Sequence, residues 1–310
     1  MKILITGSNG LLGQKLVYKL RASGRHQCIA TARGENRLVN KDGYVYERLD
    51  ITDPKQVQEV FTKHKPDVVI NTAAMTNVDA CESDREGAHK MNAEAVAYQV
   101  QALEALKKSG TSYNPLFIHL STDFIFDGTH GPLDEKALPN PLSYYAETKL
   151  EAEKIVQAST LRWAIARTVL VYGIVDNMSR SNIVLWVKSN LEQGKSINVV
   201  DDQFRTPTLA EDLADGCLLI AEKGATGIYN LSGKDFYSIL EMARVVADYY
   251  GLDKSLIKPS KSSDIKQPAK RPPVTGFIID KAIRELGYRP HSFTEGIQLL
   301  ESQIRAMKGS

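Results

Sequence analysis

The chain has 310 residues, 43% of them hydrophobic and 25% charged, a balance typical of a globular protein that folds into one or two lobes. Its 39 basic and 37 acidic residues leave a net charge of +2, which provides no general attraction to nucleic acid, and no apolar run is long enough to predict a membrane anchor. The three cysteines, Cys28, Cys81 and Cys217, are far apart and lack metal-site spacing, so we expect no disulfide framework, no zinc site and a cytoplasmic location.

The first predicted element is a buried strand, residues 2–6, that turns into a helix over residues 11–23. The turn carries Gly7, Gly10 and Gly13, in the sequence KILITGSNGLLG. Gly7 permits a tight turn, Gly10 leaves room for a phosphate, and Gly13 lets the helix approach the strand. Because the first backbone N–H groups of a helix have no partner within it, they can bind a pyrophosphate. The spacing therefore predicts a dinucleotide-binding loop, with an ordinary strand–turn–helix as the alternative.

Strand-like and helix-like segments continue to alternate through the first half of the chain. Strands are expected at residues 28–32, 45–49, 67–72 and 116–121, and helices at residues 53–63 and 85–108, the last ending at Gly110. This alternation predicts an α/β fold, a Rossmann-type doubly wound parallel sheet. Ligands bind such a sheet beyond the carboxyl ends of its strands.

After about residue 170 the pattern loosens. Helices are expected at residues 181–193, 209–222, 238–250 and 293–307, strands at 197–200 and 227–231, and a basic, proline-bearing loop at 258–273. We therefore expect an NAD(P)-binding domain over residues 1–170. A smaller C-terminal α/β substrate lobe would occupy residues 171–310, with some segments returning to the first domain.

The segment Tyr145-Ala-Glu-Thr-Lys149 places a phenol and an ammonium four residues apart on one face of a helix that Ser143 can cap. A tyrosine pKa of about 10 is too high for easy proton exchange, and a cation within about 4–6 Å lowers it. Lys149 would thus prepare Tyr145 to protonate a ketone as hydride reaches the carbon. Thr122, in HLSTDFIFDG, would hydrogen-bond the carbonyl oxygen. The alternatives are a chance Tyr/Lys pair and a hydroxyl that only satisfies the backbone.

Together with the sequence RTVLVYG (167–173), these motifs resemble the extended short-chain dehydrogenase/reductases, over residues 2 to about 300. A narrower resemblance, to the dTDP-4-dehydrorhamnose reductase family, is carried by NTAAMTNVDACE (71–82), STDFIFDG (121–128), YYAETK (144–149) and DDQFRTPTLAEDLA (201–214). The resemblance implies a Rossmann-type domain, a nicotinamide cofactor and the reduction of a 4-keto nucleotide sugar.

The same resemblance assigns site residues. It implies that Thr122, Tyr145 and Lys149 carry catalysis and that Thr122 and Asp123 touch the substrate. It matches Asn92 to an asparagine that helps a proton relay, with a plain helix residue as the alternative. With the glycines and the Tyr145–Lys149 pair, the cofactor is expected to contact Leu11, Leu12, Asp50, Ile51, Ala73, Ala74 and Met75.

Three positions depart from the family pattern. Leu170 stands where rhamnose-forming members often carry tryptophan, Phe124 where they often carry tyrosine, and Met75 where histidine or tyrosine is common. These changes leave the chemistry intact and leave the sugar open. Asp50 would accept a hydrogen bond from the adenine amino group, with capping of a nearby helix as the alternative.

The second strand ends at Arg33, where an NAD-specific site usually carries an acid, and the first acid is Glu35. A guanidinium pairs well with a 2′-phosphate, so NADP(H) is expected over NAD(H), unless Arg33 faces solvent. Arg205 and Arg271 lie in expected loops and could each meet the diphosphate of a nucleotide sugar; exposed surface arginines are the alternative. The six histidines lack metal spacing, so no catalytic metal is expected.

The leading hypothesis is therefore an NAD(P)H-dependent reductase of a 4-keto nucleotide sugar. Two alternatives stay open. One is a cofactor-binding regulatory subunit, which the chain resembles through that of methionine adenosyltransferase; the other is a nucleotide-sugar epimerase or dehydratase. We expect a nucleotide-sugar substrate, no nucleic acid or membrane partner and, by analogy with such folds, a homodimer.

Overall fold

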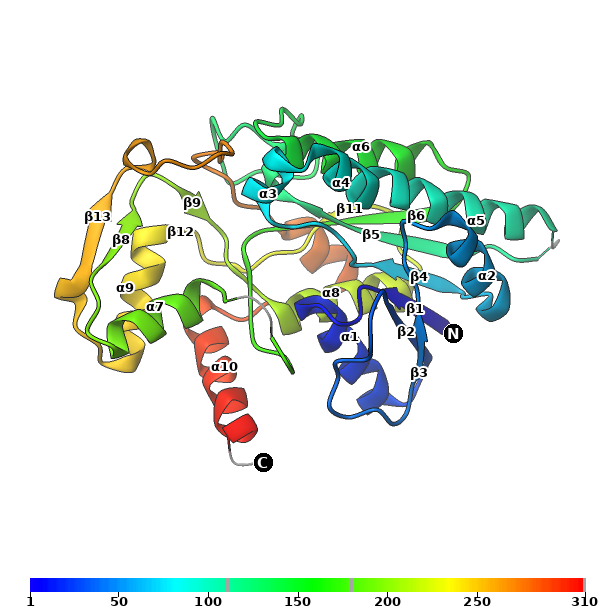
Figure 1. The fold of residues 1–310 in the computed structure, drawn as a ribbon, viewed down its shortest axis with the longest axis horizontal. Coiled ribbons are helices and arrows are strands. Elements are labelled where there is room, and N and C mark those ends of the chain that lie inside the picture. Colours follow the sequence, from blue (N-terminus) through cyan, green and yellow to red (C-terminus); the bar gives the residue numbers. More distant parts are fainter. Residues whose placement is uncertain (110–111, 179–180, 309–310) are drawn as a thin grey trace.

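The computed structural model describes residues 1–109, 112–178 and 181–308. A seven-stranded parallel sheet dominates it, in the order β11-β6-β5-β4-β1-β2-β3 (Figure 1). The strands are β1 (Lys2–Thr6), β2 (Gln27–Ala32), β3 (Val45–Arg48), β4 (Val68–Asn71), β5 (Leu116–Thr122), β6 (Arg162–Thr168) and β11 (Gly227–Asn230). The predicted Rossmann-type sheet is confirmed. Its strand order reverses between β1 and β4, which opens a crevice at their carboxyl ends.

Helices cover both faces of this sheet (Figure 1). The covering helices are α1 (Leu11–Ser23) and α8 (Ala210–Lys223) on one face, and α2 (Pro54–His64), α5 (Ala95–Ser109) and α6 (Tyr144–Ala158) on the other. Successive side chains of a strand point to opposite faces, so each strand supplies two cores. In β1, Ile3 and Ile5 pack toward α1 and α8, whereas Leu4 packs toward α2 and α5.

Local signals in the sequence place several of these helices. Asp53 caps α2 by accepting from the backbone N–H of Lys55 and Gln56. Ser143 caps α6 by accepting from Ala146, as predicted. The helical region before β5 is divided into α3 (Val78–Ser83), α4 (Arg85–His89), a π-helical turn η1 (Lys90–Glu94) and α5. Gly110, the expected end of α5, lies outside the described residues.

A second core lies in the C-terminal part of the chain. It is built from α7 (Ile183–Glu192), α9 (Ile239–Tyr250), α10 (Phe293–Lys308) and a two-stranded parallel sheet of β8 (Ile197–Val200) and β13 (Ile257–Ser260), at the left of Figure 1. The loop predicted over residues 258–273 is wrong at its start, because β13 pairs with β8 there. A two-stranded sheet consists of edges, and Pro259 is tolerated at an edge.

The C-terminal half also returns to the large sheet. β11 pairs with β6, and α8 packs against α1. Two short ribbons run near the junction of the lobes: β7 (Val171–Tyr172) with β10 (Thr208–Leu209), and β9 (Phe204–Arg205) with β12 (Tyr237–Ser238). The domain boundary at residue 170 stays a proposal. Across the described ranges, every helix is too short or too polar to span a bilayer.

Candidate active site

A cleft of about 1310 Å³ opens at the carboxyl edge of the sheet. Its wall includes the start of α1, the ends of β2, β4 and β5, the first turns of α6, and residues of the C-terminal half such as Asn182, Gln203 and Ile239. Sites for one small molecule are commonly about 300–1,000 Å³. The cleft is therefore large enough to hold a dinucleotide and a second ligand together.

One wall is the glycine turn before α1. Gly7 has φ +71°, and a side chain on Gly13 would place its Cβ 2.3 Å from the Gly7 carbonyl oxygen. These two positions therefore require glycine. Gly10 is the N-cap of α1, and no side chain caps this helix end. Gly7, Gly10, Leu11, Leu12 and Gly13 all line the cleft, so the uncapped helix end fits a pyrophosphate.

The wall at the end of β2 and β3 carries Arg33, Asp50 and Ile51, all of which line the cleft. Asp50 Oδ1 accepts from the backbone N–H of Thr52 at 3.0 Å and from its hydroxyl at 2.7 Å, a local turn that holds the carboxylate in place. The Glu35 carboxylate forms an ion pair with Arg48. Arg33 thus lies on the cleft wall at the end of β2, together with Glu35 and Arg37 of the following loop.

The loop after β4 is held from behind by Asn92. The side chain of Asn92 accepts from the Met75 backbone N–H at 2.8 Å and donates to the Met75 carbonyl at 3.1 Å and to Thr148 Oγ1 at 3.1 Å. Ala73 and Ala74 line the cleft, whereas Met75 does not and packs beside Cys81. Asn92 lies in the π-helical turn, a feature frequent at functional sites. The hydrogen bonds of Asn92 fix the backbone of the loop at Met75. A role of Asn92 in a proton relay stays a prediction.

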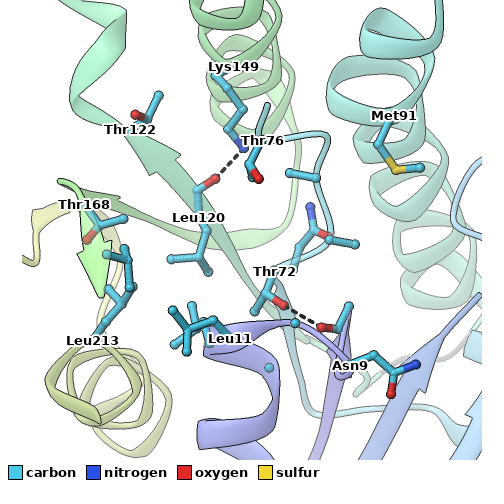
Figure 2. Close-up of a pocket in the computed structure, with 18 of the residues that line it drawn as sticks. Asn9, Leu11, Thr72, Thr76, Met91, Leu120, Thr122, Lys149, Thr168 and Leu213 are labelled. Atoms are coloured by element: carbon cyan, nitrogen blue, oxygen red, sulfur yellow. Dashed lines mark hydrogen bonds between the residues drawn. The ribbon is translucent and has the colours of Figure 1, made fainter. Parts of the chain in front are cut away.

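The opposite wall brings Thr122, Tyr145 and Lys149 together. All three line the cleft, and the Thr122 hydroxyl is close enough to the Tyr145 phenol to lower its pKa. Lys149 Nζ donates to the Leu120 carbonyl at 2.6 Å (Figure 2). Leu11, at the start of α1, lies on the other side of this view. The structure thus gathers the three predicted catalytic side chains across the cleft from the glycine turn.

The electrostatics of this wall differ from the sequence prediction. Burial raises the pKa of the Tyr145 phenol well above its usual value, and the Thr122 hydroxyl opposes that rise. Burial lowers the pKa of Lys149 to about 8, and the Glu153 carboxylate opposes that fall. The prediction that the Tyr145 phenol has a lowered pKa is therefore wrong for the protein alone, because burial outweighs the opposing Thr122 hydroxyl.

Asp123 and Arg205 form a buried pair beside these groups, with Arg205 Nε 3.6 Å from Asp123 Oδ2. Asp123 also accepts from the hydroxyls of Thr122 and Thr275, and burial raises the pKa of its carboxyl. The Arg205 guanidinium donates to three backbone carbonyls, those of Phe204, Pro272 and Pro273. Both residues line the cleft, but most Arg205 donors already have partners, which limits what it can offer a diphosphate.

Arg271 also lines the cleft. It forms a two-pronged ion pair with Asp79, with Nη1 to Oδ1 at 3.1 Å and Nη2 to Oδ2 at 2.7 Å. The pair ties the segment after β13 to α3. The contacts of both arginines with a nucleotide sugar stay predictions.

Two further features of the cleft wall were not predicted as functional. Leu170 has φ +38°, a backbone conformation that side chains other than glycine rarely adopt. Ser121 is buried, and its Oγ has no hydrogen-bond partner. No local pattern in RTVLVYG predicts the strained backbone at Leu170. The position of Ser121 at the end of a strand, by contrast, was a signal that its hydroxyl could lie in the cleft. Among residues 1–109, 112–178 and 181–308, no three His, Cys, Asp or Glu side chains cluster as metal ligands.

A family model described as the RmlD substrate binding domain matches residues 1–305. Among solved structures, a dTDP-4-dehydrorhamnose reductase of Clostridium acetobutylicum is 29% identical, with a TM-score of 0.86 and coverage of 98% of this chain and 100% of that one. A dTDP-4-dehydrorhamnose reductase of Bacillus anthracis, solved in complex with NADP, is 25% identical with a TM-score of 0.81, covering 97% and 99%.

Two curated relatives point to different roles. A Haloferax volcanii protein named "Probable low-salt glycan biosynthesis reductase Agl14" is 30% identical over 304 residues, 97% of this chain and 98% of that protein. Methionine adenosyltransferase 2 subunit beta of Bos taurus is 30% identical over 269 residues, 85% of this chain and 76% of that subunit.

Proposed function

Because this chain belongs to the RmlD substrate binding domain family, that of the dTDP-4-dehydrorhamnose reductases, we propose that it reduces the keto group of a 4-keto nucleotide sugar. As a member of this family it is an oxidoreductase of the short-chain dehydrogenase/reductase type. The observation that carries the proposal is that Thr122, Tyr145 and Lys149 line one wall of the cleft that the glycine turn also lines.

The chemistry divides between the two walls. When bound, a nicotinamide dinucleotide supplies the hydride, and its oxidised ring is a cation that favours a nearby phenolate. Tyr145 gives its proton to the ketone oxygen, and Thr122 holds that oxygen through a hydrogen bond as negative charge develops on it. Lys149, at the same wall, returns a proton to the phenolate.

The proposed cofactor is NADP(H) rather than NAD(H). Arg33 lies on the cleft wall at the end of β2 and is exposed, so its guanidinium can reach a 2′-phosphate. Glu35, the nearest acid, is paired with Arg48 and is therefore less available to the ribose 2′-hydroxyl of NAD. The NADP bound to the similar Bacillus anthracis reductase supports the same choice.

For the substrate we propose a nucleotide sugar in the part of the cleft lined by Thr122, Asp123, Arg205 and Arg271, between the domain of residues 1–170 and the lobe of residues 171–310. Buried polar groups select ligands strongly, because a ligand that leaves them unpaired loses affinity. Asp123 is the buried acid closest in sequence to Thr122 and can accept from a sugar hydroxyl.

The test is a panel of dTDP-, UDP- and GDP-linked 4-keto sugars, each followed by the loss of NADPH absorbance. We expect turnover of at least one of them by the wild type and a loss of that turnover in Tyr145→Phe. Turnover of no ketosugar, or equal rates in Tyr145→Phe, would contradict the proposal.

A second candidate is a cofactor-binding regulatory subunit, favoured by the 30% identity with methionine adenosyltransferase 2 subunit beta over 85% of this chain. This role predicts that the chain binds tightly to an enzyme and changes the kinetics of that enzyme. It also predicts that the chain itself turns over no ketosugar. Affinity purification at native concentration, followed by the panel above, separates the two roles.

A further inference from the structure

A row of buried polar side chains runs across the sheet beneath the catalytic wall. Thr6 of β1, Asn71 of β4 and His119 of β5 are paired in register, Thr6 with Asn71 and Asn71 with His119. Each is at most 1% exposed. They lie on the face covered by α5 and α6, which add Gln99 and Lys149 to the row. Buried polar groups in the middle of a sheet are costly unless they are fully hydrogen-bonded.

The hydrogen bonds fix the orientation of each amide in this row. Gln99 Nε2 lies 3.0 Å from the Ala95 carbonyl, which only accepts, so this atom is a donor. The same nitrogen lies 3.3 Å from Asn71 Oδ1, which also accepts from the Thr6 hydroxyl at 2.6 Å. The Asn71 amide nitrogen is therefore the atom that faces His119 Nδ1, at 3.1 Å.

This orientation determines the tautomer of His119. Because Nδ1 accepts from Asn71, the proton of the neutral ring lies on Nε2. Nε2 is 3.3 Å from Lys149 Nζ, which also donates to the Leu120 carbonyl. An ammonium has no lone pair to accept the Nε2–H, whereas a neutral amine accepts it and still donates to Leu120. The Nε2–H of His119 therefore has an acceptor in this row only when Lys149 is a neutral amine.

We propose that His119 is a positioning residue for the reduction, which acts through Lys149 by donating a hydrogen bond to its amine form. The role in reduction rests on the proposed function. A lysine that must return a proton to the Tyr145 phenolate has to exchange protons near neutral pH, and an isolated lysine holds its proton too strongly. His119 weakens that hold by presenting an N–H to Lys149.

The other titratable groups around this pair do not provide the same effect. On its own helix Lys149 faces Tyr145 and Glu153, and Glu153 forms a buried two-pronged ion pair with Arg167 of β6, at 2.9 and 2.7 Å. The remaining Glu153 charge raises the pKa of Lys149. The hydrogen bond proposed for His119 would lower that pKa. On the substrate side, Asp123 and Cys81 act on Tyr145. Burial and Lys149 together keep the pKa of His119 well below its usual value, so its ring stays neutral.

NMR on the protein without substrate tests the proposal independently of turnover. Above about pH 8, where Lys149 is a neutral amine, ring ¹⁵N spectra should show His119 protonated at Nε2 and bare at Nδ1, with the signals assigned by their loss in His119→Gln. A ring protonated at Nδ1, or a cationic ring, would overturn the proposal. This result stands even if no ketosugar is turned over, so its failure and the failure of the proposed function are distinguishable.

A matched pair of variants tests the effect on Lys149, whose titration is followed by the ¹³Cε signal missing from Lys149→Met. Glutamine can accept from Asn71 and donate to Lys149 as the ring does, so His119→Gln should keep the wild-type midpoint. His119→Leu lacks the donor, so its midpoint should rise by about one pH unit. An unchanged or lower midpoint in His119→Leu, or an equal rise in both variants, would overturn the proposal. If His119→Leu does not fold, the wild-type tautomer and the His119→Gln midpoint decide.

Discussion

The two walls of the cleft are built in different ways. The wall at the start of α1 presents backbone N–H groups, and its shape depends on the absence of side chains at Gly7 and Gly13. The wall at the end of β5 presents the side chains of Thr122, Tyr145 and Lys149. Polar side chains within the sheet, such as His119, contact Lys149 from below this wall. The first wall is therefore encoded by a few neighbouring residues, and the second by residues from several distant segments.

This difference predicts how each wall fails. A substitution in the backbone wall should act on cofactor binding and stability, because it changes the shape of the turn. A substitution in the side-chain wall should act on turnover, because it changes where a proton can go.

The largest effect is expected for Tyr145→Phe. The variant loses the only proposed proton donor to the ketone, so kcat should fall by about 10²–10⁴-fold. The affinity for NADPH, measured by fluorescence titration, should stay within about threefold, because the backbone wall is untouched. Tyr144→Phe is the matched control and should keep wild-type turnover. A loss of NADPH affinity as large as the loss of kcat would remove the proposed division between the walls.

Gly13→Ala tests the backbone wall. Its Cβ would lie 2.3 Å from the Gly7 carbonyl oxygen, so the turn must shift. We expect a loss of about 1–3 kcal/mol in the free energy of unfolding and at least about a tenfold loss of NADPH affinity. Gly34→Ala, which meets open space, should keep the wild-type stability. Calorimetry and fluorescence titration measure both quantities, and unchanged NADPH affinity in Gly13→Ala would argue against this turn as the pyrophosphate site.

Arg33→Ala tests how the cleft wall at the end of β2 selects between NADPH and NADH. If Arg33 pairs with the 2′-phosphate, NADPH affinity should fall about ten- to a hundredfold, while NADH affinity stays nearly constant. Arg25→Ala, an exposed arginine before β2 at the opposite edge of the sheet, is the control and should change neither affinity. Equal losses for both cofactors would mean that Arg33 does not select between them.

The buried Lys149 makes stability depend on pH. Its pKa is lowered from 10.5 to about 8, so between these values the unfolded chain binds more protons than the folded one, and the free energy of unfolding rises with pH. Relative to Lys149→Met, the wild type should gain up to about 3 kcal/mol from pH 8 to 10.5. Urea unfolding at several pH values measures this difference. A difference that stays constant, or falls, over that range would show that Lys149 keeps its ordinary pKa in the folded protein.

Much of the fold follows from the sequence, because buried parallel strands and amphipathic helices have distinct periods. The strand at Ile257–Ser260 was missed, since Lys258 and Pro259 give no strand signal and pairing with β8 decides their conformation. The glycine turn and the Tyr145–Lys149 pair were found because local spacing encodes them.

The support behind the side-chain wall could not be found in this way. His119, Asn71 and Thr6 are far apart in sequence, and only the register of β1, β4 and β5 aligns them. Thr6 and Asn71 are the last residues of β1 and β4, whereas His119 is in the middle of β5, so no shared position in the sequence marks the three. Arg205 posed the same difficulty, because an isolated arginine gives no sign that it binds backbone carbonyls.

The most direct test of the central claim is a crystal structure with NADP⁺ and the reduced nucleotide sugar. We predict that the new sugar hydroxyl lies about 2.6–3.2 Å from the Tyr145 phenol, with its carbon over the nicotinamide ring. A sugar bound with that hydroxyl pointing away from Tyr145, or a Tyr145 phenol directed away from the ring, would contradict the account.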